Sequence, residues 1–225
     1  MERPPIKLLY AGFGAAVAAL LLFAWLANEV LQGDTLRFDT AVRDTIHSWA
    51  SPQLTIAMRG ITQLGAPTFL IFITLFLILC LIWMGRRRAA MVLTVGSLGA
   101  LLLNELLKHL FHRVRPEAFF GYVEPLGYSF PSGHSISSAC FYGVAAAIIT
   151  TRMRSRARRA LVWAGAALLA GLIGFSRIYL GVHYPSDVIA AYAAAIVWVA
   201  ALRAGYGAWL RALRNRARQE ERSTG

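Results

Sequence analysis

The sequence predicts an all-α membrane protein, a bundle of six transmembrane helices with an interfacial amphipathic helix between helices 1 and 2. Two observations carry this prediction. Of the 225 residues, 57% are apolar, whereas a soluble domain is about 45–50% apolar. The apolar residues also gather into six long runs that contain no charge. Because backbone amides in lipid must be bonded within their own segment, each run is expected to form a helix.

The first run, Leu8–Ala27, is about twenty residues long, which is enough to cross a hydrocarbon core. Arg3 and Lys7 precede it, as they would precede the apolar part of a signal peptide. The run is long for that role, and Asn28-Glu29 is not a small-residue cleavage site, so we expect a retained helix. A single membrane-embedded domain, residues 1–225, is expected to hold spans at about 8–27, 67–84, 89–107, 135–151, 160–176 and 187–204.

Between the first two spans, apolar side chains recur at helical spacing, at Phe38, Val42, Ile46 and Trp49. Charged side chains fall between them, at Arg37, Asp39, Arg43 and Asp44. This pattern predicts an amphipathic helix over about 36–50 that lies at the outer membrane interface, with the tryptophan near the headgroups. The helix has two open roles, as a roof over the bundle or as a lid that gates substrate entry.

The distribution of basic residues predicts the orientation in the membrane. A net charge of +12 is also typical of nucleic-acid-binding proteins. Here, however, most of the 23 basic residues lie near the N-terminus, after the second and fourth spans and in the C-terminal tail. Short cytoplasmic segments carry such an excess. We therefore expect an integral plasma (bacterial inner) membrane protein with both termini cytoplasmic, and no nucleic-acid partner. All five histidines then fall on the periplasmic side.

Three charged segments lie at the predicted outer ends of the helices. The first runs from Lys108 to Arg115-Pro116, the second is Pro131-Ser132-Gly133-His134, and the third runs from Ser176-Arg177 through His183 to Asp187. They are far apart in sequence, but the predicted topology brings all three to one membrane level. The pattern Lys-x6-Arg-Pro, Pro-Ser-Gly-His and Ser-Arg-x5-His-x3-Asp resembles the type 2 phosphatidic acid phosphatase (PAP2) superfamily, whose members include lipid phosphatases and soluble vanadium-dependent haloperoxidases.

The resemblance implies a role for each motif residue. His183 would attack phosphorus and form a phosphohistidine, His134 would protonate the leaving oxygen, and Asp187 would orient His183. Phosphate would be bound by Lys108, Arg115, Ser132, Gly133 and Arg177. Phosphoryl transfer is catalysed largely by positioning and by cationic stabilisation of charge on the equatorial oxygens, so this residue set suits the chemistry. Ser132 is also a suitable helix N-cap, while Arg113 is interpreted as a headgroup contact or a structural pair.

We expect no metal ion and no other cofactor. His109 and His112, with His134 and His183, raise the possibility of a metal site, but zinc ligands are closely spaced on one or two elements and the nearby cations would repel a divalent ion. Glu105, one helical turn before Lys108, is expected to pair with it or its neighbours.

The predicted activity is metal-independent hydrolysis of a phosphate monoester or diphosphate on an outer-leaflet lipid. Candidate substrates are undecaprenyl diphosphate, phosphatidylglycerophosphate, phosphatidic acid and lipid A, and no residue selects among them. A lipid phosphotransferase that uses the same covalent step remains an alternative. An anion or lipid transporter is a further one, although no apolar run carries an ionisable residue at its midpoint. The sequence does not define an oligomeric state.

Overall fold

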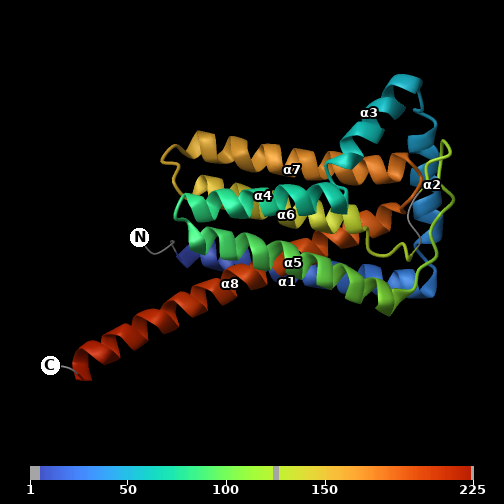
Figure 1. Cartoon of the computed structure of the whole chain (residues 1–225). Coiled ribbons are helices and arrows are strands. Elements are labelled where there is room, and N and C mark those ends of the chain that lie inside the picture. The colour runs from blue at the N-terminus through green and yellow to red at the C-terminus, as the bar shows by residue number, and fades with distance from the viewer. Residues whose placement is uncertain (1–5, 124–126, 224–225) are drawn as a thin grey trace.

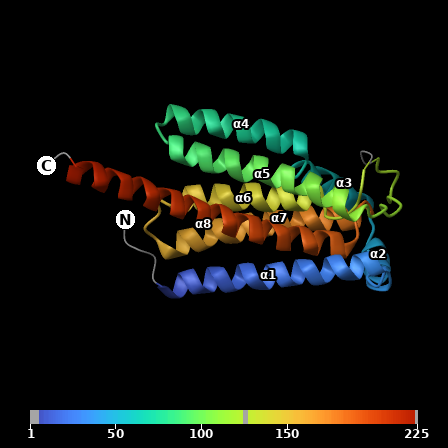
Figure 2. The same cartoon turned by 90° about the horizontal axis from the view of Figure 1, so that it is seen from below.

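The computed structural model describes residues 6–123 and 127–223, and within them it contains eight helices and no strand. The all-α prediction is therefore confirmed. The helices are α1 (Ile6–Gln32), α2 (Leu36–His47), α3 (Pro52–Gln63), α4 (Pro67–Trp83), α5 (Arg87–Phe111), α6 (Gly133–Thr150), α7 (Arg156–Tyr179) and α8 (Pro185–Ser223). The long helices run side by side along one axis, and α2 lies across one end of them (Figures 1 and 2).

The central element of the bundle is α6, which packs against α4, α5, α7 and α8. Its sequence is rich in glycine, alanine and serine. Such small side chains let helix backbones approach closely in a membrane, where burial of apolar surface does not drive association. Helix α1 packs mainly along α8. The α6 N-terminus therefore lies among the ends of α5, α7 and α8, at the same end of the bundle as α2 (Figure 1).

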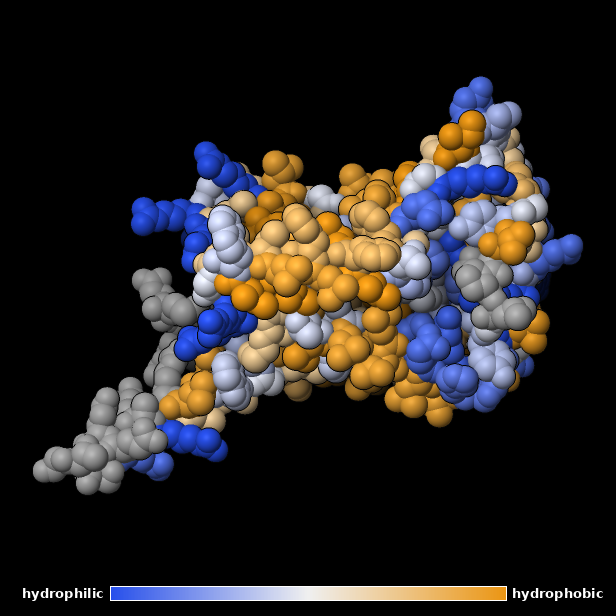
Figure 3. Space-filling view, viewed as in Figure 1, coloured by the Kyte–Doolittle hydropathy of each residue, from blue (hydrophilic) through white to orange (hydrophobic). Residues whose placement is uncertain are grey.

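Five helices are long and apolar enough to cross a membrane, namely α1, α5, α6, α7 and α8. A sixth crossing exists only if α3 and α4, which meet at a bend of 46°, are counted as one broken span. Figure 3 shows hydrophobic residues across the middle of the bundle and hydrophilic residues at both ends. The protein thus has the surface of an integral membrane protein, and the count of six spans stays a prediction.

Helix α3 was not expected from the sequence. Its start carries local helix signals, since Pro52 occupies the first turn and the Ser51 hydroxyl accepts a hydrogen bond from the Leu54 amide at 3.3 Å. Its polar residues interrupt the apolar ones, so it does not form one of the long apolar runs from which the spans were predicted.

Helix α2 forms where an amphipathic helix was predicted, and Ile46 of the predicted apolar face is buried. Two of the charged residues between the apolar positions, Asp39 and Arg43, are buried as well, whereas Phe38 is about half exposed. Both buried charges have hydrogen-bond partners inside the protein.

Two predicted boundaries also move. Arg177, expected just after the fifth span at 160–176, lies in the last turn of α7. Helix α8 begins at Pro185 and continues well beyond residue 204.

The close contact between α5 and α8 at Trp198 leads to a prediction about stability. The Trp198 indole nitrogen donates to the Gly96 carbonyl at 3.0 Å, and a Cβ added at Gly99 would overlap the indole ring. We expect Gly99→Ala to destabilise the fold by about 1–3 kcal/mol, because the ring must move out of a packed interface. A lower Tm of the detergent-purified protein would measure this. Gly143→Ala, where an added Cβ meets nothing within 4 Å, is the matched control; equal Tm values would contradict the prediction.

Candidate active site

The structure brings the three motif segments together at the α2 end of the bundle. Lys108 lies in the last turn of α5, and Arg115 follows in the α5–α6 connection. Ser132, Gly133 and His134 begin α6. Arg177 lies in the last turn of α7, His183 in the short α7–α8 connection, and Asp187 in the first turn of α8. His134 lies within electrostatic range of Arg177, His183, Lys108 and Arg115. All eight predicted site residues therefore gather in one region.

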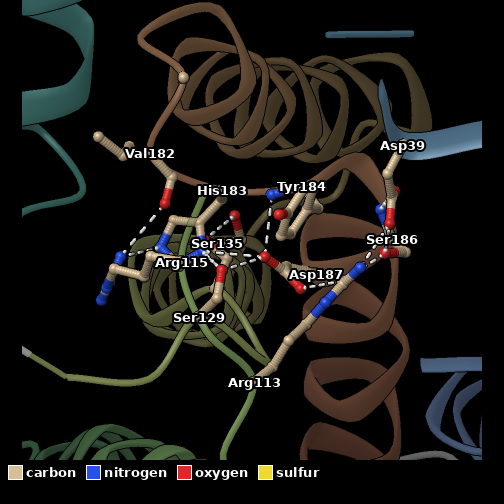
Figure 4. Close-up of polar contacts among 12 residues, drawn as sticks. Asp39, Arg113, Arg115, Ser129, Ser135, Val182, His183, Tyr184, Ser186 and Asp187 are labelled. Atoms are coloured by element: carbon tan, nitrogen blue, oxygen red, sulfur yellow. Dashed lines mark hydrogen bonds and ion pairs between the residues drawn. The ribbon is translucent and has the colours of Figure 1, made fainter. Parts of the chain in front are cut away.

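His183 is almost completely buried, with 1% of its surface exposed. Its Nδ1 lies 3.3 Å from Asp187 Oδ2, and its Nε2 lies 3.1 Å from Arg115 Nη1 (Figure 4). A carboxylate only accepts hydrogen bonds and a guanidinium only donates them. These partners therefore assign the proton to Nδ1 and leave a lone pair on Nε2. A histidine in this tautomer presents Nε2 as its nucleophilic atom.

Asp187 is held by more groups than the sequence indicated. Its Oδ2 also accepts from the Ser129 hydroxyl at 2.5 Å and from the Tyr184 amide at 2.9 Å. Its Oδ1 accepts from Arg113 Nη1 at 2.6 Å. Ser129 is a site residue that sequence reasoning missed, and its only signal was its place just before the Pro-Ser-Gly-His motif. Arg113, interpreted as a headgroup contact or a structural pair, makes a buried ion pair with Asp187.

Burial lowers the pKa of His183 to about 4. The hydrogen bond and the charge of Asp187 work against this shift, and the cations Arg177 and Arg115 add to it. Burial dominates because a charged imidazole loses its hydration inside the protein. At neutral pH His183 is therefore uncharged, which is the state in which Nε2 keeps its lone pair.

The two arginines of the site are oriented by groups that are not among the predicted site residues. Arg177 is fully buried, and its Nη1 donates to the hydroxyl of Thr62, also fully buried, at 2.7 Å. Thr62 comes from α3, the helix that was not predicted. Arg115 donates from Nε to the Gly127 carbonyl at 2.9 Å and from Nη1 to the Val182 carbonyl at 3.3 Å. Both arginines are thus oriented near His183 by side chains or carbonyls distant in sequence.

The start of α6 differs in detail from a simple serine cap. Ser132 is the N-cap residue, but its hydroxyl accepts from the Ser135 hydroxyl at 2.9 Å and not from a backbone amide. The Ser132 amide donates to the Asp187 carbonyl at 3.1 Å, which ties the starts of α6 and α8 together. A Cβ added at Gly133 would lie 3.3 Å from the Asn104 amide group, so the missing side chain makes room for α5.

His109 and His112 lie apart from these contacts, each with its ring edge-on to Tyr128. Within the described residues, no group of three or more His, Cys, Asp or Glu side chains is arranged to hold a metal ion.

Comparisons with known proteins place these features in a family. The family model described as the PAP2 superfamily matches residues 89–211. The chain is 31% identical over 177 residues to phosphatidylglycerophosphatase B of Bacillus subtilis, and this match covers 78% of this chain and 87% of that protein. It is 31% identical over 119 residues to an undecaprenyl-diphosphatase of Sulfolobus acidocaldarius, covering 51% of this chain and 53% of that protein.

A solved structure is similar over most of its length. It is the crystal structure of a transmembrane PAP2-type phosphatidylglycerolphosphate phosphatase from Bacillus subtilis. The TM-score is 0.78 at 29% sequence identity, and the match covers 84% of this chain and 94% of that chain.

Proposed function

The chain belongs to the PAP2 superfamily, and from this premise we propose that it is a membrane lipid phosphatase that works through a phosphohistidine on His183. The observation that carries the proposal is the pair of partners on the His183 ring, which assigns its tautomer. Its Nδ1–H donates to Asp187, and its Nε2 lone pair faces Arg115 at the meeting point of the three motif segments. A buried neutral imidazole with an orienting carboxylate is suited to nucleophilic attack.

In the first step Nε2 of His183 attacks phosphorus. A P–N bond forms, the bond from phosphorus to the lipid oxygen breaks, and His134 gives a proton to the leaving oxygen. In the second step water attacks the phosphohistidine, the P–N bond breaks, and His134 takes a proton from the water. Asp187 stabilises the positive charge that His183 carries between the steps, because it accepts the Nδ1–H bond throughout.

The phosphoryl oxygens would be held by Lys108, Arg115, Arg177 and the first turn of α6, which begins after Ser132 and Gly133. Cations and a helix N-terminus stabilise the charge that develops on a phosphoryl group in transfer. Arg115 has a second task in this scheme. Its Nη1 donates to His183 Nε2, and it releases the lone pair when Nη1 turns to a phosphate oxygen.

The basic residues support a placement in the membrane. Arg86, Arg87 and Arg88, the arginines of 152–159 and those of the α8 tail lie at the end of the bundle opposite the site. By the positive-inside rule that end is cytoplasmic. In this placement α3 and α4 form one broken crossing, both termini are cytoplasmic, α2 lies at the outer interface, and the site opens to the periplasmic side of a bacterial inner membrane.

The substrate class is a lipid phosphate of the outer leaflet. Phosphatidylglycerophosphate, undecaprenyl diphosphate and lipid A are the leading candidates, since relatives of this chain are named for phosphatases of each. Phosphatidic acid is the other candidate.

The test is phosphate release by the detergent-purified protein, with EDTA present, from a panel of these four lipid phosphates. We expect metal-independent turnover of at least one of them, and the relative kcat/KM values identify the preferred lipid. Phosphate that appears on an added lipid alcohol and not in solution would identify a phosphotransferase. No release from any lipid would contradict the proposal.

The burial of His183 predicts the pH profile. Attack requires neutral His183, and because its pKa is lowered to about 4, the neutral form persists as the pH falls until that value is reached. We therefore expect the acid limb of kcat/KM, which reports His183, near pH 4 and not near the ordinary histidine pKa of about 6.5. Because the mechanism also needs a protonated His134 as the acid, kcat/KM should fall again on a separate alkaline limb. An inflection near 6 that belongs to the substrate phosphate is identified by 31P NMR of the free lipid. An acid limb of the enzyme at the ordinary histidine value would contradict the assignment to His183.

A further inference from the structure

A buried carboxylate outside the motifs, Asp39 of α2, lies next to the candidate active site. Its surface is completely buried. It accepts hydrogen bonds from the Ser186 amide at 2.9 Å, the Ser186 hydroxyl at 2.7 Å and Arg113 Nη2 at 2.7 Å. The Ser186 amide belongs to the first turn of α8, where an anion is favoured by the helix dipole. Asp39 therefore connects α2 to the turn that carries Asp187.

Arg113 joins the two carboxylates. Its Nη2 bonds to Asp39 and to the Thr35 hydroxyl at 3.0 Å, and its Nη1 bonds to Asp187 Oδ1 and to the Ser186 hydroxyl (Figure 4). The guanidinium carbon lies 4.1 Å from the centre of the Tyr184 ring. Burial alone would lower the pKa of Arg113, but the charges and hydrogen bonds of Asp187 and Asp39 outweigh it and raise this pKa. The bridge is therefore a charged carboxylate–guanidinium–carboxylate chain.

We propose that Asp39 and Arg113 are positioning residues for the nucleophile, which act on His183 through Asp187. This inference rests on the proposed function. Arg113 holds Oδ1 of Asp187, so that Oδ2 stays directed at His183 Nδ1. Asp39 holds Arg113 and the first turn of α8 in place. Through the buried Asp39, helix α2 thus helps to position the nucleophile, whatever its role at the membrane surface.

The charges of the bridge give Asp39 a second task. Arg113 alone would neutralise Asp187 and weaken its stabilisation of a positively charged His183. Asp39 restores the net charge of the three groups to −1, the charge of a lone carboxylate. The bridge therefore fixes the geometry of Asp187 without removing the negative charge that the phosphohistidine needs.

The charge balance allows an experiment that separates a positioning role from a purely structural one, because only the positioning role predicts opposite shifts of the acid limb. The variants are Asp39→Asn, Arg113→Gln, the double variant and Arg113→Lys, with exposed Asp44→Asn on the same helix as the control. The readouts are kcat, KM and the acid limb of kcat/KM for the preferred lipid phosphate. The other charged and titratable groups that face His183 are the same in all variants: Asp187 of α8, Arg177 of α7, Arg115 of the α5–α6 connection and His134 of α6.

We expect Asp39→Asn and Arg113→Gln each to lower kcat about tenfold or more, as loss of a group that orients a catalytic ligand commonly does. KM should change less than about twofold, because neither residue contacts phosphate. The acid limbs should move in opposite directions: to lower pH in Asp39→Asn, which leaves the bridge neutral, and to higher pH in Arg113→Gln, which leaves two negative charges. In the double variant the limb should return towards wild type while kcat stays low.

Arg113→Lys separates the effect of the positive charge from the effect of the hydrogen-bond geometry. It also replaces Arg113→Gln in the experiment if that neutral variant does not fold. It keeps the cation but not the planar pair of donors, so we expect a near-wild-type limb with reduced kcat. The inference would be overturned, and the proposed function left intact, if these variants kept the wild-type kcat. Acid limbs of Asp39→Asn and Arg113→Gln that stay in place or move in the same direction would have the same consequence. Absence of turnover in the wild-type protein would overturn both.

Discussion

Replacement of His183 by glutamine is expected to abolish phosphate release, with a fall in kcat of about 10⁴-fold or more. Glutamine retains a polar side chain of similar reach, but its amide nitrogen has no lone pair available for attack on phosphorus. The proposed mechanism therefore loses its covalent step. Release of inorganic phosphate from the preferred lipid measures the effect. Trapping in acid is unsuitable because the P–N bond of phosphohistidine hydrolyses at low pH. The covalent intermediate should therefore be sought by mass spectrometry at alkaline pH.

The matched control is His109→Gln, a change of the same type at an exposed histidine near the same end of the bundle. It should retain wild-type turnover. Residual activity of His183→Gln within about tenfold of wild type would show that another group attacks phosphorus, and the nucleophile would have to be reassigned.

Replacement of Asp187 by asparagine is expected to lower kcat by about 10³–10⁴-fold, the effect of removing the orienting carboxylate in other catalytic triads. The Asp187 carboxylate accepts hydrogen bonds from four groups, the side chains of His183, Ser129 and Arg113 and the Tyr184 amide. An asparagine would turn an NH2 group towards some of these donors. His183 would then lose the partner that holds its proton on Nδ1.

Because Asp187 does not face the phosphate in the proposed mechanism, its loss should appear in kcat with little change in KM. Asp44→Asn, on the exposed face of α2, controls for the change of charge. A large rise in KM with kcat unchanged would contradict the orienting role and indicate instead that Asp187 shapes the binding pocket.

The sequence predicted the part of this architecture that depends on local pattern. Long uncharged runs predicted the helices that became α1, α4, α5, α6, α7 and α8, because apolar length is a property of a single segment. The three motifs predicted which ends of α5, α6, α7 and α8 would meet. Helix α3, which packs against α7, escaped prediction because it is short and partly polar, whereas the spans were sought as long uncharged runs.

The partners of the site residues could not be predicted in the same way. Arg113 contacts Asp39 across 74 positions, Ser186 contacts Asp39 across 147, and Arg177 contacts Thr62 across 115. Asp39 was interpreted as one of several charges on an amphipathic helix, and only the docking of α2 against the start of α8 makes it a buried ion-pair partner.

The sequence by itself therefore determined the class of the protein, its long helices, its family and the candidate catalytic residues, because these follow from segment hydrophobicity and from motifs of a few residues. The tertiary structure alone decided the tautomer of His183, the lowered pKa of that histidine and the bridge from Asp187 through Arg113 to Asp39. These properties depend on distances and burial between segments far apart in the chain. Such distances are set by helix packing and not by local sequence.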